Sequence, residues 1–348
     1  MISFNQKLIY SAVFVFIAGC LSALNLYFLV DDSYQRLYGV SQALSFDQKF
    51  LDFSALKDPS YFILQNLFGS FVSFPIFFAC IIWSSLFIKF RALLSLESDL
   101  SWWHIAPYLV VLGFLHEGIQ VRIALALSIA LWALVLYVYQ RPWAALFILL
   151  LASTFHLSVL AFIFVFVILI LYQYFGRKFI YLAILLIGII VLTNIVPDLM
   201  GYWGRMTNAR YMAYAKSLSE APNKSGLFQY YFIYIGLLAG LVWHLYQPNS
   251  FLWIRFKEVA LTSASLAIAI LLILRFNVIV SSRLADLLLL PLLLVLGATL
   301  VQLRDAKRYI LQWGITSILL IYGGLRGLIS FNPVLFKSLV SHLRLLLS

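Results

Sequence analysis

The stretch GFLHEGIQVRIALALSIALW (113–132) places three ionisable side chains, His116, Glu117 and Arg122, between two apolar runs. The second run continues to residue 139, and about 20 residues are what a helix needs to cross about 30 Å of hydrocarbon. Two apolar helices joined by a short charged turn are predicted here. We expect the turn at a membrane surface, where charge meets water or a bound anion rather than lipid.

The composition of the whole chain supports a membrane protein. Of its 348 residues, 64% are hydrophobic and 11% are charged, and the mean hydropathy is +1.00. Ordinary soluble domains are about 45–50% apolar and about 25% charged. A water-soluble core could not bury so much apolar surface.

The apolar residues form blocks, most of which are long enough to cross a bilayer. We count eleven, near residues 8–30, 71–90, 102–115, 120–139, 143–156, 157–174, 179–196, 228–246, 259–276, 284–302 and 309–326. The first lacks a small-residue cleavage site and is interpreted as a retained helix, not a signal peptide. The predicted fold class is an all-α polytopic integral membrane protein with about 11 transmembrane helices. No linker or repeat interrupts it, so residues 1–348 are predicted to form a single membrane domain.

The orientation follows from the basic residues of the short loops, which collect on the cytoplasmic side. With the N-terminus inside, five short inner loops hold ten of them: Lys89, Arg91, Arg141, Arg177, Lys178, Arg255, Lys257, Arg304, Lys307 and Arg308. The outer side then holds two long loops, 31–70 and 197–227. Arg122, Arg275 and Arg283 fall at outer helix ends, where a single arginine is usually an interfacial anchor. Three on one side, with Arg205 and Arg210 in the loop 197–227, favour an anion site.

Several kinds of site have no support in the sequence. No GxGxxG, P-loop, CxxC or HExxH motif is present, so no cofactor is expected. Cys20 and Cys80 lie in apolar blocks, and neither a disulfide nor a metal site is expected from them. Asp31 and Asp32 resemble a paired acidic metal site, but adjacent acids at a membrane boundary are more often a solvated helix end. The net charge of +11 comes largely from inner loops, so no nucleic-acid partner is expected.

Six motifs follow one another along the chain: DDSYQRLYG (31–39), KDPSYFILQNLFG (57–69), VRIALALSIALW (121–132), STFHLSVLAF (153–162), GRMTNARYMAYAKSL (204–218) and SSRLADLLLLPLLL (281–294). Their order resembles that of the EpsG/Wzy-like polysaccharide (O-antigen or exopolysaccharide) polymerases of bacterial membranes. The motif at 57–69 is similar to a Glu-Pro motif of this family that begins a re-entrant or amphipathic segment, with Asp58 in place of Glu. The HEG of 116–118 is not among the motifs that carry the resemblance.

The resemblance implies a GT-C-like glycosyltransferase at the outer, periplasmic face of the cytoplasmic (inner) membrane. Such a polymerase joins oligosaccharide repeat units carried on undecaprenyl diphosphate. Its partners would be the lipid bilayer, the undecaprenyl-diphosphate-linked glycan, a chain-length regulator and a flippase.

Residue chemistry adds candidates for the site. Guanidinium groups can stabilise a departing diphosphate without a metal ion, and the candidates are Arg122, Arg210, Arg275 and Arg283. A general base must accept the proton of the acceptor hydroxyl, and His156, which Thr154 and Ser158 could orient, is preferred. The alternative for His156 is an interfacial histidine bonded to a backbone carbonyl. His116 and Glu117 form a competing base pair, and their alternative is a solvated turn.

Aromatic and acidic residues of the outer loops are candidates for binding the glycan, because sugar rings pack on aromatic faces. They are Asp32, Tyr34, Tyr202, Trp203 and Tyr211. Tyr230 and Tyr231 sit at a helix start and are better explained as members of the membrane's aromatic belt.

Two other functions use similar residues. A flippase or exporter of lipid-linked oligosaccharide, or a secondary transporter, would also carry intramembrane charges. However, the sequence lacks two corresponding Gly/Pro-broken helices, and its charges gather near the outer face. An O-antigen ligase uses the same donor, and only the family resemblance separates it from a polymerase.

Overall fold

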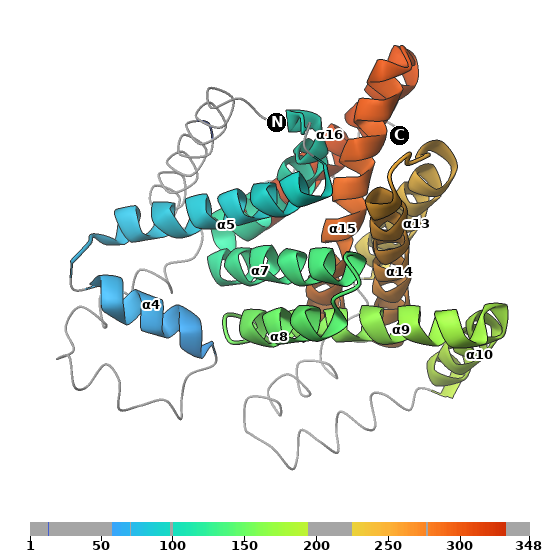
Figure 1. Cartoon of the computed structure of the whole chain (residues 1–348), viewed down its shortest axis with the longest axis horizontal. Helices are drawn as coiled ribbons and strands as arrows, with labels where there is room; N and C mark the ends of the chain where they lie inside the picture. The colour runs from blue at the N-terminus through green and yellow to red at the C-terminus, as the bar shows by residue number, and fades with distance from the viewer. Residues whose placement is uncertain are drawn as a thin grey trace. The chain divides into compact units, whose positions relative to one another are not determined.

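The computed structural model describes residues 58–69, 71–97, 100–193, 225–275 and 278–331, together with residue 13. All secondary-structure elements within these ranges are helical (Figure 1). Each predicted apolar block except 8–30, which lies outside the described residues, coincides with a helix or a run of short helices. Most of the predicted loops 31–70 and 197–227 also lies outside them. The all-α, multi-pass class is therefore confirmed.

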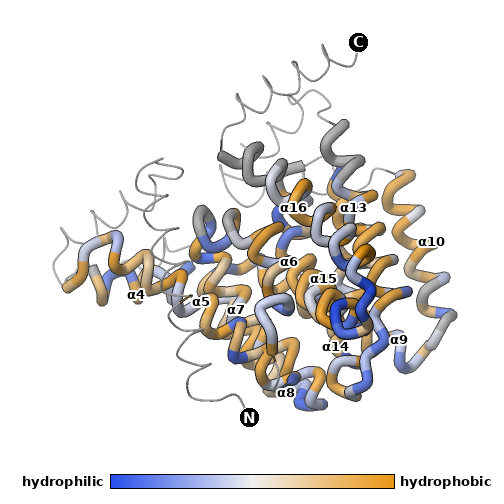
Figure 2. The backbone as a smooth tube through the Cα atoms, turned by 90° about the horizontal axis from the view of Figure 1, so that it is seen from above, coloured by the Kyte–Doolittle hydropathy of each residue, from blue (hydrophilic) through white to orange (hydrophobic). Residues whose placement is uncertain are grey.

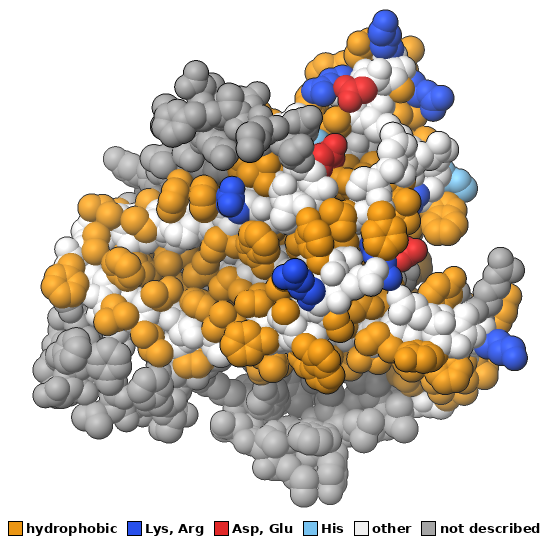
Figure 3. Space-filling model, viewed as in Figure 1, with side chains coloured by type: hydrophobic (Ala, Val, Ile, Leu, Met, Phe, Trp, Pro, Cys, Tyr) orange, Lys and Arg blue, Asp and Glu red, His pale blue; other side chains and the backbone are white. Residues whose placement is uncertain are grey.

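Five of the described helices are long and apolar enough to cross a membrane: Phe74–Leu96, Val121–Val138, Leu157–Phe175, Phe251–Ile273 and Val280–Asp305. Shorter apolar helices cover Pro142–Phe155, Tyr181–Thr193, Tyr231–Leu245 and Tyr309–Gly324. Figure 2 shows apolar residues along the helices and polar residues at several turns. On the face drawn in Figure 3, hydrophobic side chains predominate and Lys and Arg are few. This distribution suits a surface in contact with lipid.

The chain divides into two compact units, residues 1–160 with 297–348 and residues 161–296. The described elements of the first unit are α4 (Pro59–Gly69), α5 (Phe74–Leu96), η2 (Trp102–His104), α6 (Ala106–Tyr108), η3 (Leu109–Ile119), α7 (Val121–Val138), α8 (Pro142–Ser153), η4 (Leu157–Leu160) and α16 (Tyr309–Phe331), with the end of α15 (Val278–Asp305). Helix α4, with 11 residues, is too short to span a bilayer, as a re-entrant or amphipathic segment would be.

Helix α7 forms the centre of the first unit and packs against α5 and α8 (Figure 1). Ala124, Ala126, Ala130 and Ala133 are all fully buried along it. Small side chains let helix backbones approach closely. Close packing drives helix association in a bilayer, because the lipid is as apolar as the side chains and the hydrophobic effect does not act there. The packing of α7 thus fixes the positions of residues at its N-terminal end.

The predicted block 102–115 is not one regular helix. It consists of the 3-10 turn η2, the single turn α6 and the π-helix η3. Wide π-helical turns occur preferentially near functional sites. Helix α16 packs on η3, where a Cβ on Gly323 would overlap the carbonyl of Val110.

The second unit contains α9 (Ala161–Phe175), α10 (Arg177–Thr193), α13 (Ser225–Leu245), α14 (Phe251–Ile273) and α15 up to residue 296. Helix α14 contacts α9, α10 and α13. The Ser263 hydroxyl donates to the Leu288 carbonyl at 2.7 Å, which joins α14 to α15.

Candidate active site

Three ionisable side chains from distant parts of the sequence meet in the first unit, and we call Asp58, Arg122 and His156 the Asp58 cluster. Arg122 Nη1 donates to Asp58 Oδ2 at 2.8 Å. The Nδ1 atom of His156 lies 3.3 Å from Asp58 Oδ1, within ion-pair range but without hydrogen-bond geometry. The Asp58 side chain is fully buried, whereas 22% of Arg122 and 15% of His156 are exposed. A buried carboxylate is thus flanked by two groups that solvent can reach.

The start of α4 and the end of α8 bring Asp58 and His156 together. Pro59 is the first residue of α4, a position that proline favours, and Asp58 precedes it. The Ser60 amide donates to the Thr154 carbonyl at 3.1 Å, and the hydroxyls of these residues are 2.6 Å apart. Thr154 is the C-cap of α8, two residues before His156. This double link holds the two helix ends, and their acid and imidazole, side by side.

Arg122 enters the Asp58 cluster from the first turn of α7. Its guanidinium lies over the ring of Tyr61, 5.8 Å from the centroid. An arginine side chain has five N–H donors, so the bond to Asp58 does not exhaust its capacity to bind an anion. The second nitrogen of His156, Nε2, lies 3.3 Å from the Ser158 hydroxyl. A hydroxyl can therefore reach this nitrogen.

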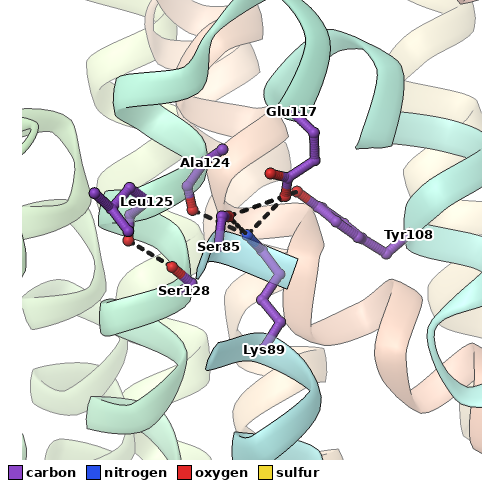
Figure 4. Close-up of polar contacts among 7 residues, drawn as sticks. All are labelled: Ser85, Lys89, Tyr108, Glu117, Ala124, Leu125 and Ser128. Carbon is purple, nitrogen blue, oxygen red and sulfur yellow. Dashed lines mark hydrogen bonds and ion pairs between the residues drawn. The ribbon is translucent and has the colours of Figure 1, made fainter. Parts of the chain in front are cut away.

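A second group of polar and ionisable residues is completely buried, and we call Ser85, Lys89, Tyr108 and Glu117 the Lys89 cluster (Figure 4). Lys89 Nζ donates to Glu117 Oε1 at 2.8 Å, to Ser85 Oγ at 2.6 Å and to the Ala124 carbonyl at 2.9 Å. Ser85 and Tyr108 also donate to Glu117 Oε1, at 3.1 and 2.8 Å. Three donors thus converge on one carboxylate oxygen.

The Lys89 cluster corrects two predictions. His116 and Glu117 do not form a solvated turn: they lie in η3 with 1% and 0% of their surface exposed. Packing of η3 against α7, α5 and α16 covers them. Lys89 does not lie in an inner loop either, because α5 continues to Leu96 and its side chain bonds to Glu117. A buried lysine inside a helix and a lysine in a loop beside it are hard to distinguish from sequence.

Comparison with known proteins assigns the chain to a family. The model of the EpsG family matches residues 5–335. The chain belongs to the EpsG family. No curated protein and no solved structure matches it. The predicted resemblance is confirmed, and membership supports a function of the polysaccharide polymerase type.

Three other arginines of this EpsG-family chain are predicted to bind diphosphate, and none belongs to the described part of the first unit. Arg275 and Arg283 belong to the second unit and are exposed. Arg275 Nη2 donates to the Val191 carbonyl at 3.2 Å. Arg210 and Asp31 lie outside the described residues. The same is true of the candidate glycan-binding residues, which are Asp32, Tyr34, Tyr202, Trp203 and Tyr211.

Tyr231 differs from its predicted place in the aromatic belt. Its side chain is buried, and its hydroxyl donates to Asp286 Oδ1. A belt tyrosine would keep its hydroxyl at the membrane interface. Tyr231 instead donates a hydrogen bond to a buried carboxylate of α15.

Asp58 is the residue of the candidate site that sequence reasoning underrated. Its motif resembles that of the family, but the Asp in place of Glu predicts no defined role for the carboxylate. The sequence does contain a signal for a role of Asp58: this acid directly precedes Pro59, which begins a helix, and Ser60 follows with a hydroxyl group. Among the described residues, no three His, Cys, Asp or Glu side chains form a group that could hold a metal ion. The Asp58 cluster has two such side chains and a guanidinium.

Proposed function

We propose that this EpsG-family protein is a polysaccharide polymerase that joins oligosaccharide repeat units carried on undecaprenyl diphosphate. The proposal includes about 11 transmembrane helices in a GT-C-like arrangement, and a reaction at the periplasmic face of the inner membrane. The observation that supports it most is the Asp58 cluster, which combines a base, an orienting acid and an anion-binding cation.

His156 is the proposed general base. The Asp58 carboxylate, 3.3 Å from Nδ1, favours the tautomer with the proton on Nδ1, as in other carboxylate–histidine pairs. Nε2, which lies beside the Ser158 hydroxyl, is then the nitrogen that accepts a proton. Nε2 removes the proton of the acceptor hydroxyl as its oxygen attacks the anomeric carbon of the donor. The new bond forms as the bond from that carbon to the diphosphate oxygen breaks, and the electron pair leaves with the lipid diphosphate.

Arg122 is the proposed partner of the leaving group. Negative charge develops on the diphosphate as the sugar–oxygen bond breaks, and a guanidinium in a water-poor site stabilises it. An arginine side chain has five N–H donors, so Arg122 can bind the diphosphate while Nη1 stays on Asp58. Arg210, Arg275 and Arg283 are further proposed ligands of the diphosphate, and no metal ion is required. Activity of the purified protein should then survive excess chelator, and an absolute need for a divalent ion would redirect attention to Asp31 and Asp32.

Gene deletion followed by gel analysis of surface polysaccharide tests the function. A polymerase deletion should abolish the ladder of long chains and leave products that carry one repeat unit. The wild-type gene should restore the ladder. Complete loss of attached repeat units would contradict the proposal and indicate flipping or ligation.

A further inference from the structure

The Lys89 cluster lies where η3 ends and α7 begins. Glu117 is near the C-terminal end of η3, and Ala124 belongs to the first turn of α7. Lys89 Nζ bonds to both, at 2.8 and 2.9 Å, from the neighbouring helix α5. Figure 4 shows the ammonium group between Glu117 and the start of α7. One side chain therefore joins two consecutive helices of the chain.

The junction that Lys89 joins has an irregular backbone. Gln120 has φ −111° and ψ 53°, outside helical values, and its amide donates to the Leu115 carbonyl at 2.9 Å. Arg122 follows two residues later and carries the guanidinium of the Asp58 cluster. Movement at this junction would therefore displace Arg122 directly.

A fully buried ion pair is an expensive way to fasten two helices. Transferring two charges out of water costs several kcal/mol per ion, and well-packed apolar residues often serve stability as well or better. Glu117 Oε2 increases this cost, since it is buried without a hydrogen-bond partner among the described residues. Ionisable residues kept inside membrane segments usually mark function.

We propose that Lys89 and Glu117 are positioning residues that hold Arg122 in place to bind the donor diphosphate. This inference rests on the proposed function of the Asp58 cluster. Lys89 fixes the first turn of α7 through the Ala124 carbonyl, and Glu117 fixes the end of η3. Together they set the height and direction of Arg122 relative to Asp58. Neither side chain contacts the reacting groups.

The test uses the double variant Lys89→Met/Glu117→Gln in the full-length protein. Methionine matches the length of lysine, and the glutamine oxygen still accepts from Tyr108 and Ser85, so both charges disappear with little loss of packing. Ser128→Ala is the matched control, because its buried hydroxyl donates to the Leu125 carbonyl of the same helix at 2.7 Å. Both proteins are compared in membranes for hydrogen–deuterium exchange of residues 117–125 and for polymerisation of lipid-linked repeat units.

We expect faster exchange over 117–125 in the double variant and an activity loss of about tenfold to a hundredfold, the penalty of misplacing a binding group by about 1 Å. The loss should appear mainly as a raised KM for the lipid-linked donor. The triple variant Lys89→Met/Glu117→Gln/Arg122→Lys should be little less active than the single variant Arg122→Lys, because both sets of changes act through the same guanidinium. Ser128→Ala should leave exchange and activity unchanged.

Several results would overturn the inference. Unchanged exchange over 117–125 would show that Lys89 does not hold the junction. Faster exchange with normal activity, or a loss that adds fully to that of Arg122→Lys, would show that the junction does not act through Arg122. Failure of the wild type to polymerise would contradict the proposed function and, with it, a donor-binding role for Arg122. Exchange would still decide whether Lys89 holds the junction.

Discussion

The Asp58 cluster and the Lys89 cluster both pair a carboxylate with a cation at 2.8 Å, but they differ in what solvent can reach. In the Lys89 cluster both partners are completely buried, and the surrounding donors are a serine and a tyrosine. In the Asp58 cluster only the acid is completely buried, and the histidine and arginine are partly exposed. Only the Asp58 cluster can meet a substrate directly.

This difference separates two uses of charge inside one membrane protein. A partly exposed imidazole can exchange protons with a substrate, and a partly exposed guanidinium can bind an anion. A buried pair can do neither without opening, but it is strongly directional and holds backbone in a fixed place. Substitutions in the Asp58 cluster should therefore act mainly on activity, whereas those in the Lys89 cluster should lower stability and affect activity only through the position of Arg122.

The largest expected effect is on activity, in the Asp58 cluster. His156→Ala should lower turnover by about 10²–10⁴, because a general base contributes that much to proton abstraction. Initial rates with purified protein and lipid-linked repeat units measure it. His244→Ala, which removes an exposed histidine of α13, is the control and should retain activity. Near-normal turnover of His156→Ala at normal abundance would make His156 structural and direct the search for the base to Asp58 or Asp32.

The next effect is on stability and compares the two acids. Glu117→Gln alone leaves Lys89 charged and buried without a counter-ion, which should destabilise the protein by about 3–5 kcal/mol. Asp58→Asn should cost less, because Arg122 and His156 can be solvated. Thermal unfolding in detergent measures both. Equal losses would show that exposure does not distinguish the clusters.

A smaller effect is expected for the cation of the Asp58 cluster. Arg122→Lys keeps the charge but loses the planar fork, so one charge-assisted hydrogen bond worth about 1.5–3 kcal/mol is lost. That corresponds to a reduction in kcat/KM of about tenfold to a hundredfold, with weaker donor binding. Arg91→Lys, on the exposed side of α5, is the matched control. A rate loss with unchanged donor KM would contradict a role in donor binding.

The helices and the site were predictable from the sequence to different degrees. Long apolar runs locate helices because helix length must match membrane thickness. Arg122 and His156 stood out because charge near apolar runs is rare. Asp58 and Lys89 did not, since their roles depend on contacts with residues 64 and 28 positions away. Such contacts arise from packing of α4, α5, η3 and α7 and have no periodic signal.

The smallest expected effect concerns the link that holds the Asp58 cluster together. Ser60→Ala removes the hydroxyl contact with Thr154 but keeps the backbone bond from residue 60 to the Thr154 carbonyl. One neutral hydrogen bond contributes about 0.5–1.5 kcal/mol, so polymerisation should fall only about twofold to tenfold. Ser153→Ala is the control, since its exposed hydroxyl bonds to the Leu150 carbonyl of its own helix. The Asp58 cluster, partly open to solvent, relies on this link, whereas Lys89 is fastened by charge. Ser60→Ala should therefore lower activity with little change in the unfolding temperature. A lower unfolding temperature with normal activity would place Ser60 among residues that only stabilise the fold.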